Sequence, residues 1–267
     1  MNIGIFSYFG YPIPLEDRAK MISNAGFKSV MLWWANDIKD NPPTSKQPEL
    51  FRKHGLEIAN AHLPFDRINA LWDDNLDGES LYEMLAACVS DCGTYDIPVA
   101  VMHVSRGDTP PKPSDIGFDR IKRLTALGEK LNVDIAFENT RNLDYLDLIF
   151  SRIKSDRLKF CYDSGHEYAV NKMLGIDIDL LEKYGDKLAA LHLHDNDGTG
   201  DQHLMPFDGT APWEEIMARL RITGYKGDLT LENEATKKDI VKYSPEEYLA
   251  ESMKRARRLL CGEKSPI

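Results

Sequence analysis

The stretch Leu191-His192-Leu193-His194-Asp195-Asn196-Asp197-Gly198-Thr199-Gly200-Asp201-Gln202-His203 joins a short apolar strand to a polar loop. Alternation along a strand places His192 and His194 on one face, and Asp201 and His203 follow two positions apart in the loop. Four side chains that can bind a metal therefore lie within twelve positions. Taken singly, a strand histidine is more often a hydrogen-bonded core residue, and a loop of Gly, Asp and Asn is usually a turn. The stretch becomes informative only if other parts of the chain bring similar groups to the same place.

Outward from this stretch, short apolar runs alternate with amphipathic segments along the whole chain. The expected strands are Ile3–Phe6, Ser29–Trp33, Glu57–His62, Ala100–His103, Asp134–Glu138, Lys159–Asp163, Ala190–His194 and Asp228–Glu232. The expected helices are Leu15–Ala25, Pro48–His54, Gly78–Cys92, Asp115–Leu131, Leu143–Ile153, Ile178–Tyr184, Trp213–Arg221 and Pro245–Leu260. This alternation predicts an α/β fold, a closed (β/α)8 TIM barrel, as one domain over residues 1–267. The alternative is an open doubly wound sheet, which often carries a glycine-rich phosphate loop, and neither GxGxxG nor GxxxxGK[ST] occurs in the chain.

Composition and charge restrict the classes of molecule that the protein can be expected to bind. The net charge is −10, from 33 Lys and Arg against 43 Asp and Glu, which argues against nucleic acid as a partner because phosphate binding needs a basic surface. The chain has no apolar run long enough for a membrane span and no signal-peptide pattern, so we expect no membrane partner and a cytoplasmic location. Its four cysteines lack CxxC spacing, which is typical of reduced thiols. Homo-oligomers are common among such barrels, although no interface can be located from the sequence.

The carboxyl ends of the expected strands carry an unusual set of polar side chains. Active sites of TIM barrels lie at these ends. The ten acidic and imidazole groups found there are His62, His103, Glu138, Asp163, His166, His192, His194, Asp201, His203 and Glu232. Without bound cations, such a set would accumulate uncompensated negative charge and crowded polar groups. The sequence therefore predicts a metal centre.

The donor types restrict the metal. Carboxylates with imidazoles and no thiolate suit Mn²⁺, Zn²⁺, Co²⁺ or Fe²⁺ better than a structural zinc site rich in cysteine. We therefore expect a divalent cofactor, with Mn²⁺, Zn²⁺, Co²⁺ and Mg²⁺ as the main candidates. We expect one metal site, and the sequence leaves open whether there are two or three.

Two glutamates on opposite sides of the predicted barrel, Glu138 and Glu232, indicate a reaction type. A metal that chelates a carbonyl and its neighbouring hydroxyl acidifies the carbon-bound hydrogen and stabilises the enediolate. One carboxylate can then remove the proton while the other delivers it.

The strand-end motifs resemble those of xylose isomerase-like barrels, which include sugar and sugar-phosphate isomerases and epimerases and the AP endonucleases of family 2. The motifs that carry the resemblance span nearly the whole chain and are Ala61-His62-Leu63-Pro64, Met102-His103, Phe137-Glu138-Asn139-Thr140, Asp163-Ser164-Gly165-His166, His192-Leu193-His194-Asp195, Asp201-Gln202-His203 and Leu231-Glu232. In the isomerase branch, the resemblance implies one metal held by Glu138, Asp163, His192 and Glu232. In the branch of endonuclease IV type, it implies five further ligands, namely His62, His103, His166, Asp201 and His203.

We expect the isomerase branch, because the rim loops carry only scattered basic residues and because Trp33 and Phe65 suit the walls of a polyol site. Either Trp33 or Trp34 is expected to pack in the core. His194 also departs from the endonuclease pattern, because the matching position in that pattern resembles an asparagine. The alternatives are an AP endonuclease-type phosphodiesterase with a multinuclear zinc site, a related lyase, or a non-catalytic binding protein.

The expected function is therefore a divalent-metal-dependent isomerase or epimerase of a small sugar, sugar phosphate or cyclic polyol ketone, in carbohydrate metabolism. Glu138 and Glu232 would transfer the proton, and His166 would contact substrate or a second metal. The expected substrate-binding residues are Trp33, His194, Arg106 and Arg141.

Overall fold

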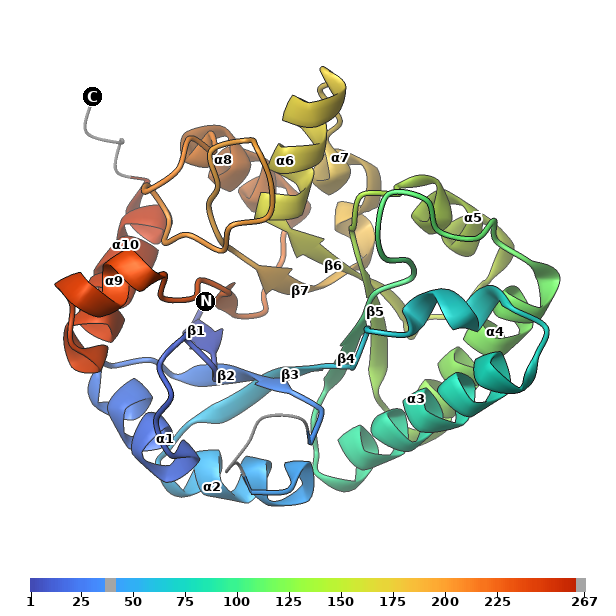
Figure 1. The fold of residues 1–267 in the computed structure, drawn as a ribbon, viewed down its shortest axis with the longest axis horizontal. Coiled ribbons are helices and arrows are strands. Elements are labelled where there is room, and N and C mark those ends of the chain that lie inside the picture. Colours follow the sequence, from blue (N-terminus) through green and yellow to red (C-terminus); the bar gives the residue numbers. More distant parts are fainter. Residues whose placement is uncertain (37–41, 263–267) are drawn as a thin grey trace.

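Eight strands form one sheet in this computed structural model, which describes residues 1–36 and 42–262 (Figure 1). The strands are β1 (Ile3–Phe6), β2 (Ser29–Trp33), β3 (Glu57–His62), β4 (Val99–Met102), β5 (Asp134–Glu138), β6 (Leu158–Asp163), β7 (Leu188–His192) and β8 (Leu229–Leu231). Their spatial order is β7-β6-β5-β4-β3-β2-β1-β8, and each paired neighbour runs parallel. Sequence neighbours therefore lie side by side, as repeated βα units require.

The barrel closes between β7 and β8 through residues that follow β7. Leu193 bridges Leu231 in parallel register. The amide of Leu193 donates to the carbonyl oxygen of Thr230 at 3.0 Å, and the amide of Glu232 donates to the carbonyl oxygen of Leu193 at 3.0 Å. The predicted TIM barrel is confirmed as a nearly closed barrel, and the closing hydrogen bonds bring the surroundings of His192 and Glu232 together.

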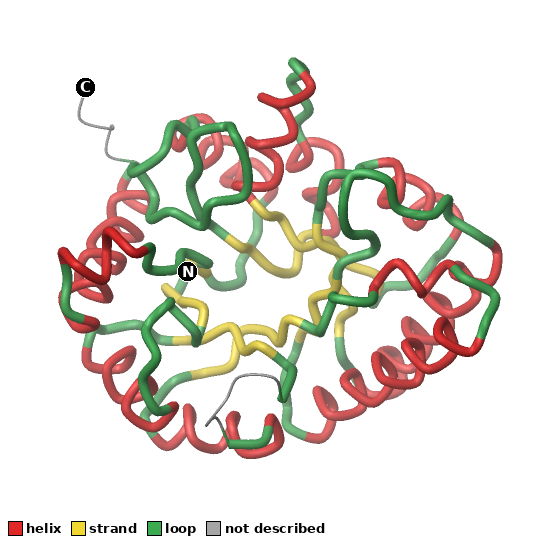
Figure 2. Tube along the Cα trace, viewed as in Figure 1, coloured by secondary structure: helices red, strands yellow, loops and turns green. Residues whose placement is uncertain are grey.

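Helices surround the strands on the outside of the barrel (Figure 2). They are α1 (Leu15–Asn24), α2 (Gln47–Lys53), α3 (Leu76–Thr94), α4 (Asp115–Leu131), α5 (Asp144–Arg152), α6 (Ser164–Leu174), α7 (Leu180–Tyr184), α8 (Trp213–Thr223), α9 (Lys237–Lys242) and α10 (Pro245–Cys261). Short 3-10 helices are η1 (Thr44–Lys46), η2 (Ile68–Trp72) and η3 (Gly185–Lys187). None of the described helices has the length and apolar character needed to cross a bilayer.

The expectation of eight helices is wrong, because the described residues contain ten α-helices. The helix α6 was missed because Asp163 is both the last residue of β6 and the N-cap of α6, so no loop separates the two. Its Oδ1 accepts a hydrogen bond from the amide of His166 at 2.6 Å. His166, which was expected in a loop, therefore lies in the first turn of α6. The short helix α9, which begins with a capping box of Thr236 and Asp239, was also missed.

Three strands end earlier than the sequence predicts. As regular strands, β4 ends at Met102, β7 at His192 and β8 at Leu231. His103, His194 and Glu232 therefore lie one or two residues beyond these strands. This displacement of one or two residues leaves each side chain at the same end of the barrel.

Apolar side chains fill both faces of the sheet. The larger cluster lies between strands and helices and contains the bulky aliphatic and aromatic residues. The cluster inside the barrel consists of the smaller side chains Val99, Val101, Ala136, Cys161 and Ala190. Two positions further along four of these strands, alternation places His103, Glu138, Asp163 and His192. The interior packing thus forms the floor beneath the predicted site.

Candidate metal centre

Glu138 is buried at the end of β5 among four histidines. Its Oε1 lies 3.2 Å from His103 Nε2 and 3.1 Å from His166 Nδ1. Its Oε2 lies 3.2 Å from His62 Nε2 and 2.9 Å from His192 Nδ1. These last two contacts lack hydrogen-bond geometry, so Oε2 is a buried oxygen without a hydrogen-bond partner. Such an oxygen is costly to bury, and a cation shared with His62 and His192 would satisfy it.

A second group of donors surrounds Asp163 and Asp201. Asp163 Oδ1 lies 3.1 Å from His194 Nε2 and 3.6 Å from His166 Nδ1. Asp201 Oδ1 lies 3.2 Å from His203 Nε2, and its Oδ2 lies 3.2 Å from His166 Nε2. The rings of His194 and His203 stack with centroids 4.1 Å apart. His166 therefore connects this group to Glu138.

Backbone carbonyls orient three of the imidazoles, and one of the contacts is that of His166 Nδ1 with the carbonyl oxygen of Asn139 at 2.9 Å. His62 Nδ1 lies 2.9 Å from the carbonyl oxygen of Leu63, and His203 Nδ1 lies 2.9 Å from that of Glu232. A carbonyl oxygen only accepts, so each Nδ1 carries a proton and donates it. In the neutral ring, Nε2 then keeps its lone pair and faces a carboxylate. A hydrogen bond from the ring nitrogen that does not face the metal is how metal-binding histidines are commonly oriented.

The donor set fits a divalent cation. Four sets of three residues each bring their ligand atoms within 4.8 Å of one another: His62, Glu138 and His192; Asp163, His166 and His194; His194, Asp201 and His203; and Asp163, His192 and Glu232. Among the nine predicted ligands, only His103 belongs to none of these sets, although it contacts Glu138. None of the four sets contains a cysteine, so nitrogen and oxygen are the donors.

Burial and the neighbouring charges shift the pKa values of Glu138 and Glu232 in opposite directions. Burial favours the neutral form of Glu138, but His103 and His192 outweigh it and hold the pKa of Glu138 well below 4.5. Burial raises the pKa of Glu232 well above 4.5, and the negative charges of Glu138 and Asp163 raise it further. Without a bound metal, Glu138 is therefore the stronger acid of the two and Glu232 the weaker one.

The donors around Asp201 form ion pairs. Burial opposes ionisation of Asp163, yet His166 and His194 lower its pKa to about 2. Burial likewise opposes the charge on His203, but Asp201 raises its pKa to about 9. A metal bound here would replace these imidazole protons, so metal binding and proton release are linked.

A cavity of about 430 Å³ opens beside His103 and His166. Arg106 and Arg141, two of the expected substrate-binding residues, line it. Each guanidinium is already paired with a carboxylate. Arg106 Nη1 lies 2.6 Å from Asp66 Oδ1, and Arg141 Nη1 donates to Asp108 Oδ1.

A second cavity, of about 240 Å³, lies on the other side of Phe65 and is lined by Trp33 and Glu232. The Trp33 ring lies 5.5 Å from that of Phe65. Trp34, by contrast, is buried in the core and donates from Nε1 to Asp91 Oδ2 at 3.2 Å, as expected for one of the two tryptophans. His194 is fully buried and lines neither cavity, and it belongs instead to two of the four ligand sets.

A family profile described as xylose isomerase-like TIM barrel matches residues 19–259. The chain belongs to this family. It is 38% identical over 245 residues to the uncharacterized protein y4fM of Sinorhizobium fredii, which covers 85% of this chain and 73% of that protein. It is 35% identical over 257 residues to the fructoselysine 3-epimerase of Shigella flexneri, which covers 87% of this chain and 90% of that protein.

A crystal structure of a D-tagatose 3-epimerase-like protein has the same fold as this xylose isomerase-like barrel. It superposes with a TM-score of 0.75 at 22% identity and covers 97% of this chain and 100% of that chain. The family predicted from the strand-end motifs is thus confirmed.

Two residues of this xylose isomerase-like barrel were not identified from the sequence. Asn139 is fully buried and its side chain binds the backbone of Asp163. Glu234 lines the smaller cavity. Asn139 occurs in a quoted motif, and Glu234 lies two residues after Glu232, but their roles depend on tertiary contacts that no spacing rule reveals.

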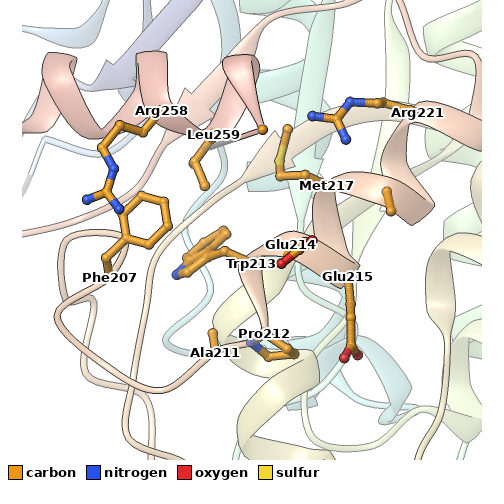
Figure 3. A pocket seen from close by; sticks show the side chains of 12 residues that line it. Phe207, Ala211, Pro212, Trp213, Glu214, Glu215, Met217, Arg221, Arg258 and Leu259 are labelled. Atoms are coloured by element: carbon orange, nitrogen blue, oxygen red, sulfur yellow. The ribbon is translucent and has the colours of Figure 1, made fainter. Parts of the chain in front are cut away.

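A further cavity, of about 600 Å³, lies outside the barrel between α8 and α10 (Figure 3). Its walls include Phe207, Trp213 and Arg258, and the guanidinium of Arg258 lies 4.0 Å from the centroid of the Phe207 ring. None of the predicted ligands lines it. Trp213 contributes to the site indirectly, because its Nε1 donates to Asp195 Oδ2 at 2.8 Å and so anchors the start of the loop that follows β7.

Proposed function

We propose that this protein is a divalent-metal-dependent epimerase or isomerase of a small sugar or related polyol ketone. One observation carries the proposal. Glu138 from β5 and Glu232 after β8 both reach His192, with Oε2 atoms 2.9 Å and 3.6 Å from its Nδ1. Family membership and the 35% identity to a fructoselysine 3-epimerase support this class of enzyme.

The first metal site would consist of Glu138, Asp163, His192 and Glu232. The orphaned Oε2 atoms of both glutamates and the unpaired ring nitrogens of His192 support this assignment. When bound there, a divalent cation polarises a carbonyl and its neighbouring hydroxyl and so acidifies the hydrogen on the carbon that bears the hydroxyl. His62 would support Glu138 at Oε2 and His103 at Oε1, and His166 lies where it can contact a substrate oxygen or a second cation.

The two glutamates would move the proton. One glutamate, as the carboxylate, would remove the hydrogen from one face of the carbon, and the other, as the carboxylic acid, would return a proton to the opposite face, which inverts the configuration. The first glutamate ends protonated and the second ionised. Exchange of these protons with water, or turnover in the reverse direction, restores the starting state.

Replacing either glutamate tests these roles. We expect Glu232→Gln and Glu138→Gln each to reduce the rate of deuterium exchange from solvent into a ketose by about 10²–10⁴-fold. Glu49→Gln, an exposed position on α2, is the matched control and should keep the wild-type rate. Circular dichroism would confirm that each variant is folded. Undiminished exchange in folded Glu232→Gln would contradict the assignment.

A metal-dependent phosphodiesterase is the second candidate. It is favoured by the convergence of His62, His103, His166, Asp201 and His203 on the first four ligands, as the endonuclease branch would require. The net charge of −10 and the pairing of Arg106 and Arg141 with aspartates oppose it, because DNA phosphates need available cations. Cleavage of DNA that contains an abasic site is the test, and we expect none.

A further inference from the structure

Asp195 is a fully buried residue in the loop that leads from β7 to α8 (Figure 1). Its Oδ1 accepts hydrogen bonds from the amides of Asn196 at 2.9 Å and Ala211 at 3.0 Å. Its Oδ2 accepts from the amide of Phe207 and from Trp213 Nε1, both at 2.8 Å. One carboxylate therefore joins the beginning of the loop to two points near its end and to the first residue of α8.

The loop closed by this carboxylate contains two of the candidate metal ligands, Asp201 and His203. The backbones of Asp195 and Leu204 exchange two hydrogen bonds, at 2.8 and 2.9 Å, so the chain returns to Asp195 directly after His203. The ring of His203 then stacks on that of His194, with centroids 4.1 Å apart. The positions of both ligands therefore depend on where Asp195 holds the loop.

The backbone of this loop is strained and closely packed. His203 has a φ of +48° and Phe207 a φ of +73°, which is uncommon for residues other than glycine and rare for a bulky side chain unless the surroundings enforce it. At Gly209, a Cβ atom would lie 2.2 Å from the carbonyl oxygen of Asn196 and 2.4 Å from Asp195 Oδ1, so the loop needs glycine there. Asp195 thus supports a conformation that the backbone alone disfavours.

Resting on the metal-dependent function proposed above, we infer that Asp195 is a positioning residue, which holds Asp201 and His203 at the metal centre and binds neither the metal nor the substrate itself. Each of its oxygens already accepts two N–H groups. Asp195 belongs to none of the four ligand sets and lines neither cavity beside the site.

An amide cannot replace the carboxylate of Asp195. In Asp195→Asn, one orientation of the side chain directs its NH₂ group at the amides of Asn196 and Ala211. The other orientation directs it at the N–H groups of Phe207 and Trp213. Either way two hydrogen bonds are lost and donors face donors, although the shape of the side chain is kept. We therefore expect Asp195→Asn to loosen the loop while the barrel stays folded.

Hydrogen–deuterium exchange and Zn²⁺ titration of the full chain test this inference. In Asp195→Asn, the amides between Asn196 and Ala211 should exchange faster than in the wild type, and those of the strands should not. The affinity for Zn²⁺, measured by competition with a chelator, should fall about 10–100-fold. The binding step that Asp201→Asn weakens should be the same one, so the double variant should bind Zn²⁺ no more weakly than Asp201→Asn alone.

Two further variants and a control separate positioning from general stability. Trp213→Phe removes one of the four donors, keeps a ring at this buried position and should weaken Zn²⁺ binding about three- to tenfold. Gly209→Ala keeps all four donors but forces the loop away from Asp195, so it should resemble Asp195→Asn. The control is Asp179→Ala, because Asp179 caps α7 by accepting from the amide of Glu182 at 2.9 Å. It should lower thermal stability without changing Zn²⁺ affinity.

The outcomes separate this inference from the proposed function. The inference is wrong if Asp195→Asn keeps both wild-type exchange and wild-type Zn²⁺ affinity, if Asp179→Ala loses as much affinity, or if Asp201→Asn binds Zn²⁺ like the wild type. If Asp195→Asn does not fold, the same criteria apply to Trp213→Phe. If the variants behave as expected but the wild type exchanges no hydrogen between a ketose and solvent, positioning by Asp195 stands and the proposed reaction fails.

Discussion

Asn139 holds the backbone of Asp163 at both of its hydrogen-bonding groups. Its Oδ1 accepts from the amide of Asp163 at 2.8 Å, and its Nδ2 donates to the carbonyl oxygen of Asp163 at 2.8 Å. Both residues are fully buried. Because Asn139 directly follows Glu138, this pair of hydrogen bonds fixes the separation between two proposed ligands on neighbouring strands.

Asn139→Asp should therefore weaken metal binding. The substitution keeps the shape of the side chain but replaces the Nδ2 donor with an oxygen that faces a carbonyl oxygen. We expect about 10–100-fold weaker affinity, the usual effect of losing a group that orients metal ligands, measured by competition with a chromogenic chelator.

Asn171 offers a matched control for this substitution. Its side chain makes the same two contacts to Ile178 near the end of α6, with Nδ2 to the carbonyl oxygen at 2.9 Å and the amide to Oδ1 at 3.1 Å. Asn171→Asp should lower thermal stability but leave metal affinity unchanged. Equal loss of metal affinity in both variants would mean that Asn139 acts only through general stability.

Stability of the metal-free protein should decrease between pH 6.5 and 9. Burial disfavours the charge on His203, but Asp201 raises its folded pKa from 6.5 to about 9. A raised histidine pKa stabilises the fold fully below the unfolded value of 6.5, and this contribution is lost as the pH rises through 9. Asp201, whose pKa is lowered by His166 and His203 despite burial, stays ionised across this window.

Thermal melting of chelator-treated protein across this pH range measures the effect. His203→Asn and Asp201→Asn should each remove the same part of the pH dependence. A melting temperature that falls equally in the wild type and both variants would assign the slope to other groups.

Adding a divalent cation to chelated protein should raise its melting temperature. A ligand at about 100 times its Kd stabilises the folded state by about 2.7 kcal/mol, which corresponds to roughly 5–10 °C for a protein of this size. Glu138→Gln should reduce this shift strongly, because Glu138 contacts four of the histidines. No shift with Mn²⁺, Zn²⁺, Co²⁺ or Mg²⁺ would contradict the metal centre.

The barrel and the convergence of the candidate ligands at one end of it were predictable because local patterns determine both. Strand periodicity of two places Glu138, Asp163 and His192 inward, and an error of one residue in a strand end does not move a side chain to the other end of the barrel. For this reason His194 and Glu232 remain at the site even though both lie beyond the strands that were expected to contain them.

The parts that could not be predicted depend on contacts between distant segments. Spacing alone does not show that Asp163 caps α6 while it ends β6, or that Asn139 reaches the backbone of the next strand. The pairing of Arg141 with Asp108 likewise joins two separate loops, so the sequence does not reveal this ion pair.

The measurement that tests the central claim most directly is hydrogen exchange in ²H₂O on purified protein of known metal content, with cleavage of abasic-site DNA followed on the same sample. We predict that metal-loaded protein introduces deuterium at the reacting carbon of a free ketose, that chelation abolishes the exchange, and that DNA stays intact. Strand cleavage by protein with two or three bound zinc ions, without exchange into any sugar, would contradict the account and identify a phosphodiesterase.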